Sequence, residues 1–381
     1  MTELARRRDE TLAERLIHMN WLVLVSVSLL VAIGTATLYS VEGGSFEPWA
    51  ERHGVRFLLG FGVILAMVAM PMWLWRAAAL PIYLLALGLL LLVPVLGVEA
   101  LGAKRWLDVF GLQFQPTEVM KVAIVLMLAR YYDALPPSRI ADPVAVFVPV
   151  VIIAVPLAFT LSQPDLGSAA LYAAVGLGLM FLAGVPILYF AGGAMVAAFA
   201  IPFVWAGLHD YQRRRIETFL DPGADPLGAG YHIAQSKIAL GAGGISGKGF
   251  MQGTQSQLDF LPEKHTDFIF TTFAEEWGFW GALGLLVLYA ILLTLLAIMA
   301  MRARSMFARL VIAGAWSTIF VYVFINIAMV SGLVPVVGVP LPFVSYGGTS
   351  MVTLLAALGL ALAADVDEGQ NRRMLRRASR P

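Results

Sequence analysis

The 381-residue chain contains no cysteine, which excludes a disulfide framework, a thiolate metal site and a cysteine nucleophile. Charged residues are also scarce, at 13% of the chain, whereas a soluble domain carries roughly 25%. The 26 basic and 25 acidic residues leave a formal net charge of +1, so the composition does not indicate a nucleic-acid-binding protein. Because 59% of the residues are hydrophobic, the chain is predicted to be an integral membrane protein.

Two common site patterns are also missing from the sequence. The five histidines show neither an i,i+4 pair nor a His-x-x-Glu-His spacing, so we do not expect a zinc site built by the protein. The glycine-rich segment 241–249 is not part of a strand–helix unit, so it does not indicate a nucleotide-binding loop.

Long uncharged stretches predict ten membrane-spanning helices. A helix that crosses the hydrocarbon needs ~20 mainly apolar residues, because its backbone groups must be hydrogen-bonded within the helix. We expect a tight turn at residues 73–76 between the second and third spans, and breaks at 184–186 and 331–348 within the two longest uncharged stretches. The expected spans are residues 16–41, 57–74, 77–98, 116–132 and 143–164, two within 166–209, one from about 267 to 301, and two within 310–364.

The predicted fold class is an all-α integral membrane protein with ten transmembrane helices and both termini in the cytoplasm. This orientation leaves 15 Lys and Arg residues in cytoplasmic segments and four in the short outer segments, as the positive-inside rule requires. Residues 1–15 would form a cytoplasmic N-terminal segment, residues 16–366 the membrane domain and residues 367–381 a basic cytoplasmic tail. Within the membrane domain, residues 208–266 would form a large extracellular loop between spans 7 and 8.

Charged residues in or beside the spans are the first candidates for a function. An ionised side chain inside a span costs ~2.5–3.5 kcal/mol on insertion scales, so it normally faces a polar cavity or another charge. Glu118 and Lys121 are three residues apart on the fourth span and can pair, either as a structural clamp or beside a substrate. Asp267 opens the eighth span with Thr266 as its expected N-cap. Its carboxylate either complements the helix dipole or deprotonates a headgroup bound at the outer mouth.

Other polar residues are open to two interpretations each. The outer segment 104–106, Lys-Arg-Trp, suits phosphate and sugar contacts, but it equally suits an interfacial belt of aromatic and cationic side chains. The three arginines at 213–215 are either a solvated stripe or a contact with anionic lipid. Asp165 is expected to be a loop or cap residue, whereas Glu275 and Glu276 either lie in the bundle interior or touch substrate.

Several short segments share a distinctive order along the chain. The longest is residues 332–348, GLVPVVGVPLPFVSYGG; the others are 104–107, 114–118 with Lys121, 163–167, 215–226 with 230–232, 253–257 and 260–268. Together they resemble the SEDS family (shape, elongation, division and sporulation) over about residues 15–365. Residues 253–267 resemble the RodA-like branch, and the departures, Thr117 and Ala242, touch no proposed catalytic group.

The resemblance implies a peptidoglycan glycosyltransferase of the bacterial cytoplasmic (inner) membrane, active during cell elongation. Such an enzyme polymerises lipid II, as donor and acceptor, at the outer face of that membrane. It works with a class B penicillin-binding protein and other cell-elongation proteins, and with no nucleic acid. Asp267 falls on the essential aspartate of the family and is assigned as general base. The implied substrate-binding residues are Lys121, Glu118 (which holds Lys121), Arg105, Lys104, Trp106, Gln115, Arg215 and His265.

Three questions stay open at this point. A divalent cation, Mg²⁺ or Mn²⁺, between Asp267 and the diphosphate is compatible with the chemistry, although the sequence shows no dedicated ligand set. The alternative function is a lipid II flippase or another transporter, because charged residues inside a multi-span bundle also suit transport. A non-catalytic scaffold for a crosslinking partner is the third hypothesis, and it would leave Asp267 replaceable.

Overall fold

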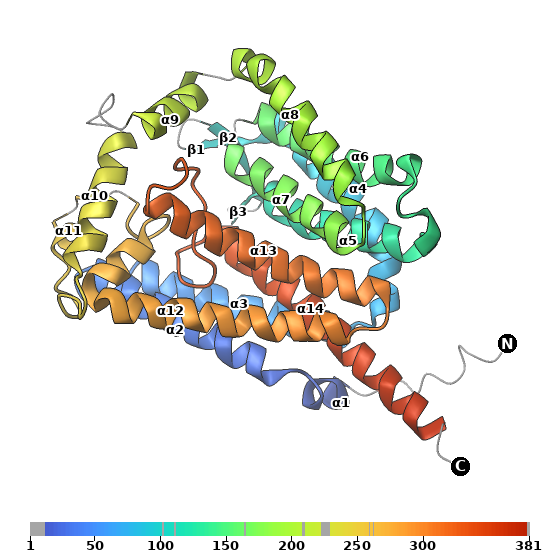
Figure 1. The fold of residues 1–381 in the computed structure, drawn as a ribbon. Helices are drawn as coiled ribbons and strands as arrows, with labels where there is room; N and C mark the ends of the chain where they lie inside the picture. Colours follow the sequence, from blue (N-terminus) through green and yellow to red (C-terminus); the bar gives the residue numbers. More distant parts are fainter. Residues whose placement is uncertain are drawn as a thin grey trace.

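The computed structural model of the chain describes residues 12–100, 103–109, 112–163, 165–207, 210–221, 229–258, 260–261 and 263–378. These residues form a bundle of helices with one small sheet (Figure 1). The long helices are α2 (Trp21–Val41), α3 (Trp49–Ala69), α4 (Met72–Leu96), α5 (Pro116–Ala134), α6 (Pro143–Ser162), α7 (Leu166–Leu182), α8 (Ile187–Gly207), α12 (Ile269–Arg302), α13 (Met306–Val330) and α14 (Gly348–Ala378). The shorter helices are α1 (Leu12–Ile17), η2 (Pro137–Arg139), α9 (Asp210–Leu220), α10 (Ala229–Ala242) and α11 (Thr254–Gln257).

Seven of the described helices are long and apolar enough to cross a membrane. They are α2, α3, α4, α6, α12, α13 and the part of α14 from Gly348 to Gln370. The apolar helices α7 and α8, which are separated at residues 184–186 as expected, and the charged helix α5 occupy the remaining predicted stretches. The chain is therefore a mostly helical, multi-pass membrane protein.

The predicted tight turn at residues 73–76 is wrong, because these residues lie inside α4. The chain turns instead at Met70 and Pro71, between the end of α3 and the start of α4. Met70 has an extended backbone, with φ −91° and ψ 135°. Proline disfavours the helical conformation in the residue before it, so Pro71 ends α3 before the charge pattern suggests.

The all-α prediction misses a small antiparallel sheet between α4 and α5. Its strands are β1 (Val98–Ala100), β2 (Ala103–Val109) and β3 (Leu112–Phe114), in the order β1-β2-β3. Trp106 of β2 pairs with Val98, and the next residue, Leu107, pairs with Phe114. A chain that has left the hydrocarbon is not restricted to helix, because water is available to its unpaired backbone groups.

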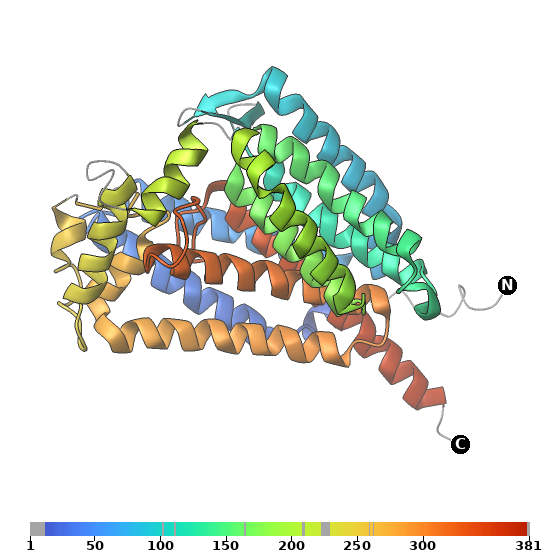
Figure 2. The same cartoon turned by 45° about the horizontal axis from the view of Figure 1, so that its top comes forward.

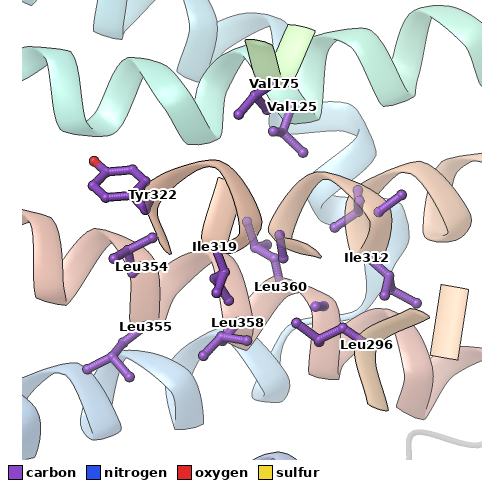
Figure 3. Close-up of a cluster of buried hydrophobic side chains, with 14 of the residues drawn as sticks. Val125, Val175, Leu296, Ile312, Ile319, Tyr322, Leu354, Leu355, Leu358 and Leu360 are labelled. Carbon is purple, nitrogen blue, oxygen red and sulfur yellow. The ribbon is translucent and has the colours of Figure 1, made fainter. Parts of the chain in front are cut away.

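Helix α13 lies at the centre of the bundle, in contact with α5, α7, α12 and α14. In the most apolar stretch of α13, 67% of the residues are buried inside the bundle. The corresponding share for α12 is 28%, so most of that stretch of α12 faces outward from the bundle. Figure 3 shows Ile319 and Tyr322 of α13 beside Leu354 and Leu358 of α14. Helix α13 therefore packs against α5, which carries Glu118 and Lys121, and against α12, which follows Asp267.

Helix α14 continues past residue 366 and holds the end of the bundle opposite α10 and α11 (Figures 1 and 2). Asp367 forms a 2.6 Å ion pair with Arg15 of α1 and accepts a 2.8 Å hydrogen bond from the backbone of Met72. Glu368 accepts hydrogen bonds from the backbone nitrogens of Arg304 and Ser305, both at 3.0 Å. These carboxylates fix the α3–α4 and α12–α13 turns to α14.

Candidate active site

Asp267 lies half-buried in the turn that precedes α12. The N-cap of α12 is Phe268, and the helix itself begins at Ile269. The expected cap by Thr266 is wrong, because its hydroxyl donates to Oε2 of Glu263 (2.9 Å) and lies 3.3 Å from the carbonyl oxygen of the same residue. Asp267 Oδ2 lies 3.5 Å from the point that a Cβ would occupy on Gly338. The carboxylate is therefore bordered by the long loop between α13 and α14.

Asn326 of α13 connects Asp267 with that loop, and sequence reasoning missed it. Its Nδ2 donates to the carbonyl oxygen of Asp267 at 2.9 Å and to that of Val339 at 2.7 Å. The signal was available, because an amide inside an otherwise apolar span is costly unless it is hydrogen-bonded. The sequence alone does not show which residues bond to it.

The predicted pairing of Glu118 with Lys121 is confirmed. Lys121 Nζ lies 2.6 Å from Glu118 Oε1, and their side chains are 3% and 7% exposed. The hydroxyl of Tyr322, from α13, contacts Lys121 Nζ and lies 3.2 Å from Glu118 Oε2. Tyr322 and Asn326 are one helical turn apart on α13, so one face of this helix carries contacts to both the ion pair and Asp267.

A narrow cavity adjoins this ion pair between α5, α13 and α14. Its volume is about 10 Å³, which is room for about one water molecule and not for a substrate. Glu118, Lys121 and Tyr322 line it together with apolar side chains, and Asp267 is not among its lining residues. In this structure Lys121 is thus enclosed by the bundle.

Gln115 and Asp165 meet beside the same loop. Gln115 Nε2 donates to Asp165 Oδ2 at 3.2 Å, while Asp165 Oδ1 accepts from the backbone of Ser168 at 3.0 Å and caps α7. The expectation that Asp165 is a cap is confirmed. A Cβ on Gly167 would lie 2.7 Å from the carbonyl oxygen of Val337, the neighbour of Gly338. Gly167 and Asp267 therefore approach adjacent residues of one loop, and Gln115 bonds to Asp165, two residues before Gly167.

The cationic segment at residues 104–106 lies in β2. The side chain of Lys104 is exposed, whereas those of Arg105 and Trp106 are partly buried. The indole of Trp106 lies 3.6 Å from the point that a Cβ would occupy on Gly348, the first residue of α14. The strand thus lies next to the loop that borders Asp267.

His265 belongs to a cluster of aromatic side chains at the start of α3. It stacks on Trp49 with ring centres 4.2 Å apart, and Tyr346 meets Trp49 edge-on at 4.6 Å. Arg56 lies over the ring of Tyr346, 4.1 Å from its centre. Burial lowers the pKa of His265 below its ordinary value, with a smaller opposing effect from the carboxylate of Glu263. His265 was a candidate from the sequence, whereas its neighbours Trp49 and Arg56 were not.

Among the remaining charged candidates, Arg213, Glu275 and Glu276 have structural contacts. Arg213 donates to the carbonyl oxygens of Trp205 (3.1 Å) and Ala206 (2.7 Å), so it caps the end of α8. Arg215 lies in α9, but its side chain is outside the described part of the structure. Glu275 Oε1 lies 2.5 Å from Lys248 Nζ, and Glu276 contacts the hydroxyl of Ser40. Both glutamates are buried, as the bundle-interior interpretation requires.

The geometry can be compared with proteins of known family. The family model FTSW_RODA_SPOVE, described as a cell cycle protein, matches residues 14–370. The chain is 40% identical over 350 residues to peptidoglycan glycosyltransferase MrdB of Escherichia coli K12, an alignment that covers 91% of this chain and 93% of MrdB. It is 36% identical over 360 residues to the probable peptidoglycan glycosyltransferase FtsW of Trichlorobacter lovleyi, with the same coverage of 91% and 93%.

Two solved structures show the same architecture. A chain from a peptidoglycan synthase complex that coordinates polymerization and crosslinking has a TM-score of 0.80 and 32% identity, covering 92% of this chain and 99% of that chain. The rod shape determining protein RodA of Thermus thermophilus has a TM-score of 0.70 and 28% identity, covering 92% of this chain and 97% of that chain. With its sequence motifs, its helices and nearly its whole length in agreement, the chain belongs to the FtsW/RodA/SpoVE family of cell cycle proteins.

Proposed function

We propose that this protein is a peptidoglycan glycosyltransferase that polymerises lipid II at the outer face of the bacterial cytoplasmic membrane during cell elongation, with Asp267 as general base. The observation that carries the proposal is the half-buried Asp267 carboxylate, held at the end of the bundle between α12 and the loop containing Gly338. The similarity to MrdB and to RodA supports the reaction class and the role in elongation.

The reaction joins the 4-hydroxyl of an acceptor GlcNAc to the anomeric carbon of a donor MurNAc, and undecaprenyl diphosphate leaves. A sugar hydroxyl is a poor nucleophile, so a carboxylate within hydrogen-bond reach accelerates its attack by accepting the proton. The departing diphosphate requires positive charge, which Arg105 and Lys104 of β2 supply at the outer surface. Trp106 offers an aromatic face to a sugar ring, and Gln115 and His265 complete the proposed set of substrate contacts.

Lys121 has a conditional place in this scheme. Its ammonium group is enclosed with Glu118 and Tyr322 beside a cavity of about 10 Å³. A diphosphate therefore reaches Lys121 only when α5, α13 or α14 moves apart from its neighbours. Until then, Glu118 neutralises the buried ammonium and holds it in contact with Tyr322, which lies one turn of α13 from Asn326.

The proposed topology has ten spans, formed by α2 to α8 and α12 to α14. Both termini are cytoplasmic, residues 208–266 are extracellular, and the divisions at residues 15 and 366 follow the membrane boundaries. The contact of Arg15 in α1 with Asp367 in α14 supports placing both ends of the chain on one side.

A divalent cation fits this site only if the substrate completes its coordination. Among the residues that the structure describes, no group of three or more Asp, Glu or His side chains is close enough to hold a metal. Mg²⁺ is commonly bound by one or two carboxylates together with substrate phosphates, and Asp267 is the protein ligand that such an ion would use here.

The proposed partner is a class B penicillin-binding protein that crosslinks the new strand, together with other cell-elongation proteins. The match to a chain from a peptidoglycan synthase complex supports this partner. The formal net charge of +1 does not suggest a nucleic-acid partner.

The decisive experiment uses purified full-length protein, alone and with its partner, and labelled lipid II in detergent. We expect glycan polymer with the wild type and with Glu263→Gln, which changes an exposed acid of the same loop. Asp267→Asn preserves the shape of the side chain, and we expect it to lower the rate by ~10²-fold or more because the general base is lost.

Two other results would assign another function. If no polymer forms but lipid II crosses sealed vesicles, the protein is a transporter. If polymer forms only from the partner and Asp267→Asn changes nothing, the protein is a scaffold.

A further inference from the structure

Three successive backbone carbonyls next to the proposed catalytic acid accept hydrogen bonds from a distant part of the chain. The carbonyl oxygen of His265 accepts from the backbone nitrogen of Tyr346 at 2.9 Å, and that of Thr266 accepts from Ser345 Oγ at 2.6 Å. The carbonyl oxygen of Asp267 itself accepts from Asn326 Nδ2 at 2.9 Å. The backbone of residues 265–267 is thus held at three consecutive positions.

From this arrangement we infer that Asn326 is a positioning residue, which fixes the Asp267 carboxylate for proton transfer without touching the substrate. The inference rests on the proposed function of Asp267. Asn326 is completely buried, and its amide donates both to Asp267 and to Val339. Val339 follows Gly338, the residue that borders the carboxylate. One side chain therefore sets the separation between the acid and the loop that faces it.

The direction of these hydrogen bonds distinguishes Asn326 from an ordinary polar residue in a helix. A short polar side chain inside a helix normally bonds to its own backbone one turn away. Asn326 instead bonds to two segments outside α13, and its NH₂ group has two donors, one for each. Since the amide lies inside an apolar helix, both carbonyls would lose their partner if the residue became apolar.

The loop itself is fixed by other contacts that do not involve Asn326. The hydroxyl of Tyr289 donates to the carbonyl oxygen of Pro342, and His53 Nε2 lies 3.1 Å from that of Phe343. Ser345 Oγ also accepts from the backbone of Leu341 at 2.7 Å. Loss of Asn326 therefore leaves the loop attached to the bundle, while the carbonyl oxygens of Asp267 and Val339 each lose one hydrogen bond.

The expected consequence is kinetic. A displacement of a catalytic group by ~1 Å can lower a rate by ~10²-fold. The contacts that other residues make with the substrate do not change in such a variant. We expect Asn326→Leu, which is similar in size, to lower kcat for lipid II polymerisation by roughly 10- to 100-fold. The KM for lipid II should change by less than about threefold, because Asn326 makes no substrate contact.

The test compares four variants of the full-length protein with its partner. Asn326→Leu and Ser345→Ala each remove one hydrogen bond to residues 265–267, Tyr289→Phe removes a bond to the same loop elsewhere, and Asp267→Asn removes the base. Lipid II binding stoichiometry counts the folded molecules, so kcat is expressed per binding-competent protein. The inference requires a lower kcat at nearly constant KM in the first two variants and wild-type kcat in Tyr289→Phe.

Each other outcome has a defined meaning. If Asp267→Asn is inactive but Asn326→Leu and Ser345→Ala retain wild-type kcat, the positioning role is overturned and the proposed function stands. Equal losses in Asn326→Leu and Tyr289→Phe also overturn it, because the effect then belongs to the loop as a whole. If Asn326→Leu does not fold, Asn326→Ala, which removes the same amide, takes its place in the comparison. A fully active Asp267→Asn rejects the proposed function itself.

Discussion

Lys121 and Glu118 form an ion pair of 2.6 Å inside the helix bundle, and neither side chain is more than 7% exposed. The gain from such a pair is largely offset by the cost of removing both charges from water. Removal of one partner is different, because the other charge is then left buried without compensation. This asymmetry separates a structural role of the pair from a role in substrate binding.

We expect Lys121→Met to lower the free energy of unfolding by ~3–5 kcal/mol, since it leaves Glu118 as a buried, unpaired carboxylate. The double variant Glu118→Gln/Lys121→Met should recover most of this loss, because both charges are gone. Thermal unfolding in detergent measures the stability of each variant, and lipid II polymerisation measures its activity.

The double variant decides between the two roles. If it folds like the wild type and polymerises normally, the ion pair is a structural clamp and Lys121 does not bind the diphosphate. If it folds but has lost polymerisation, Lys121 is required for the reaction, and the enclosed state seen here must open during turnover.

Gly338 offers a test of the space around Asp267. It has a positive φ of 74°, and a Cβ there would lie 3.5 Å from Asp267 Oδ2. Gly43 has a similar φ of 65° with nothing within 4 Å of its Cβ position. Each alanine substitution should cost ~1–2 kcal/mol of stability through the left-handed backbone. Only Gly338→Ala should also lower kcat for polymerisation, because only its methyl group would lie against the Asp267 carboxylate. Equal kcat values for the two variants would show that Asp267 functions with a methyl group beside its carboxylate.

Acid should weaken the end of the bundle that carries His265. Burial lowers its pKa in the folded protein below the ordinary value of about 6.5, so the unfolded chain binds the proton more readily. The stabilisation from keeping this histidine neutral is complete above about pH 6.5 and is lost as the pH falls through the lower folded pKa. His265→Gln should therefore be less acid-sensitive than the wild type in thermal unfolding at about pH 7.5 and about pH 5.5. Parallel losses in the two proteins would contradict this assignment.

Glu275 should control the order of the loop that contains Lys248 and Gln255. The buried carboxylate lies 2.5 Å from Lys248 Nζ and accepts from the backbone of Gln255 at 3.1 Å, so it joins two parts of the loop to α12. We expect Glu275→Ala to increase cleavage between residues 244 and 258 in limited proteolysis. Glu263→Gln, at an exposed acid, should leave the cleavage pattern unchanged. Similar digestion of both variants would mean that other contacts hold the loop.

The sequence predicted features that depend on residues close together along the chain, and it missed contacts between residues that are far apart in the sequence. Uncharged runs located the apolar helices, and a spacing of three residues predicted the contact of Glu118 with Lys121, because both depend on neighbouring residues. The third member of that cluster, Tyr322, comes from α13, 201 residues away from Lys121. Pairings over such a distance have no local periodicity, so neither Tyr322 nor the partners of Asn326 were predicted. Trp49 was missed for the same reason, since its contact with His265 forms only after folding.

The contacts of α14 restrict how many residues can lie between Gly348 and Asp367. Its first residue, Gly348, lies beside Trp106, and Asp367, 19 residues further along the helix, is bonded to Arg15 and Met72. These 19 positions span about 29 Å at 1.5 Å per residue, close to the ~30 Å thickness of the hydrocarbon. Each residue also turns a helix by ~100°. A single inserted residue would therefore rotate one set of contacts out of phase with the other, so the number of residues in this interval is itself constrained.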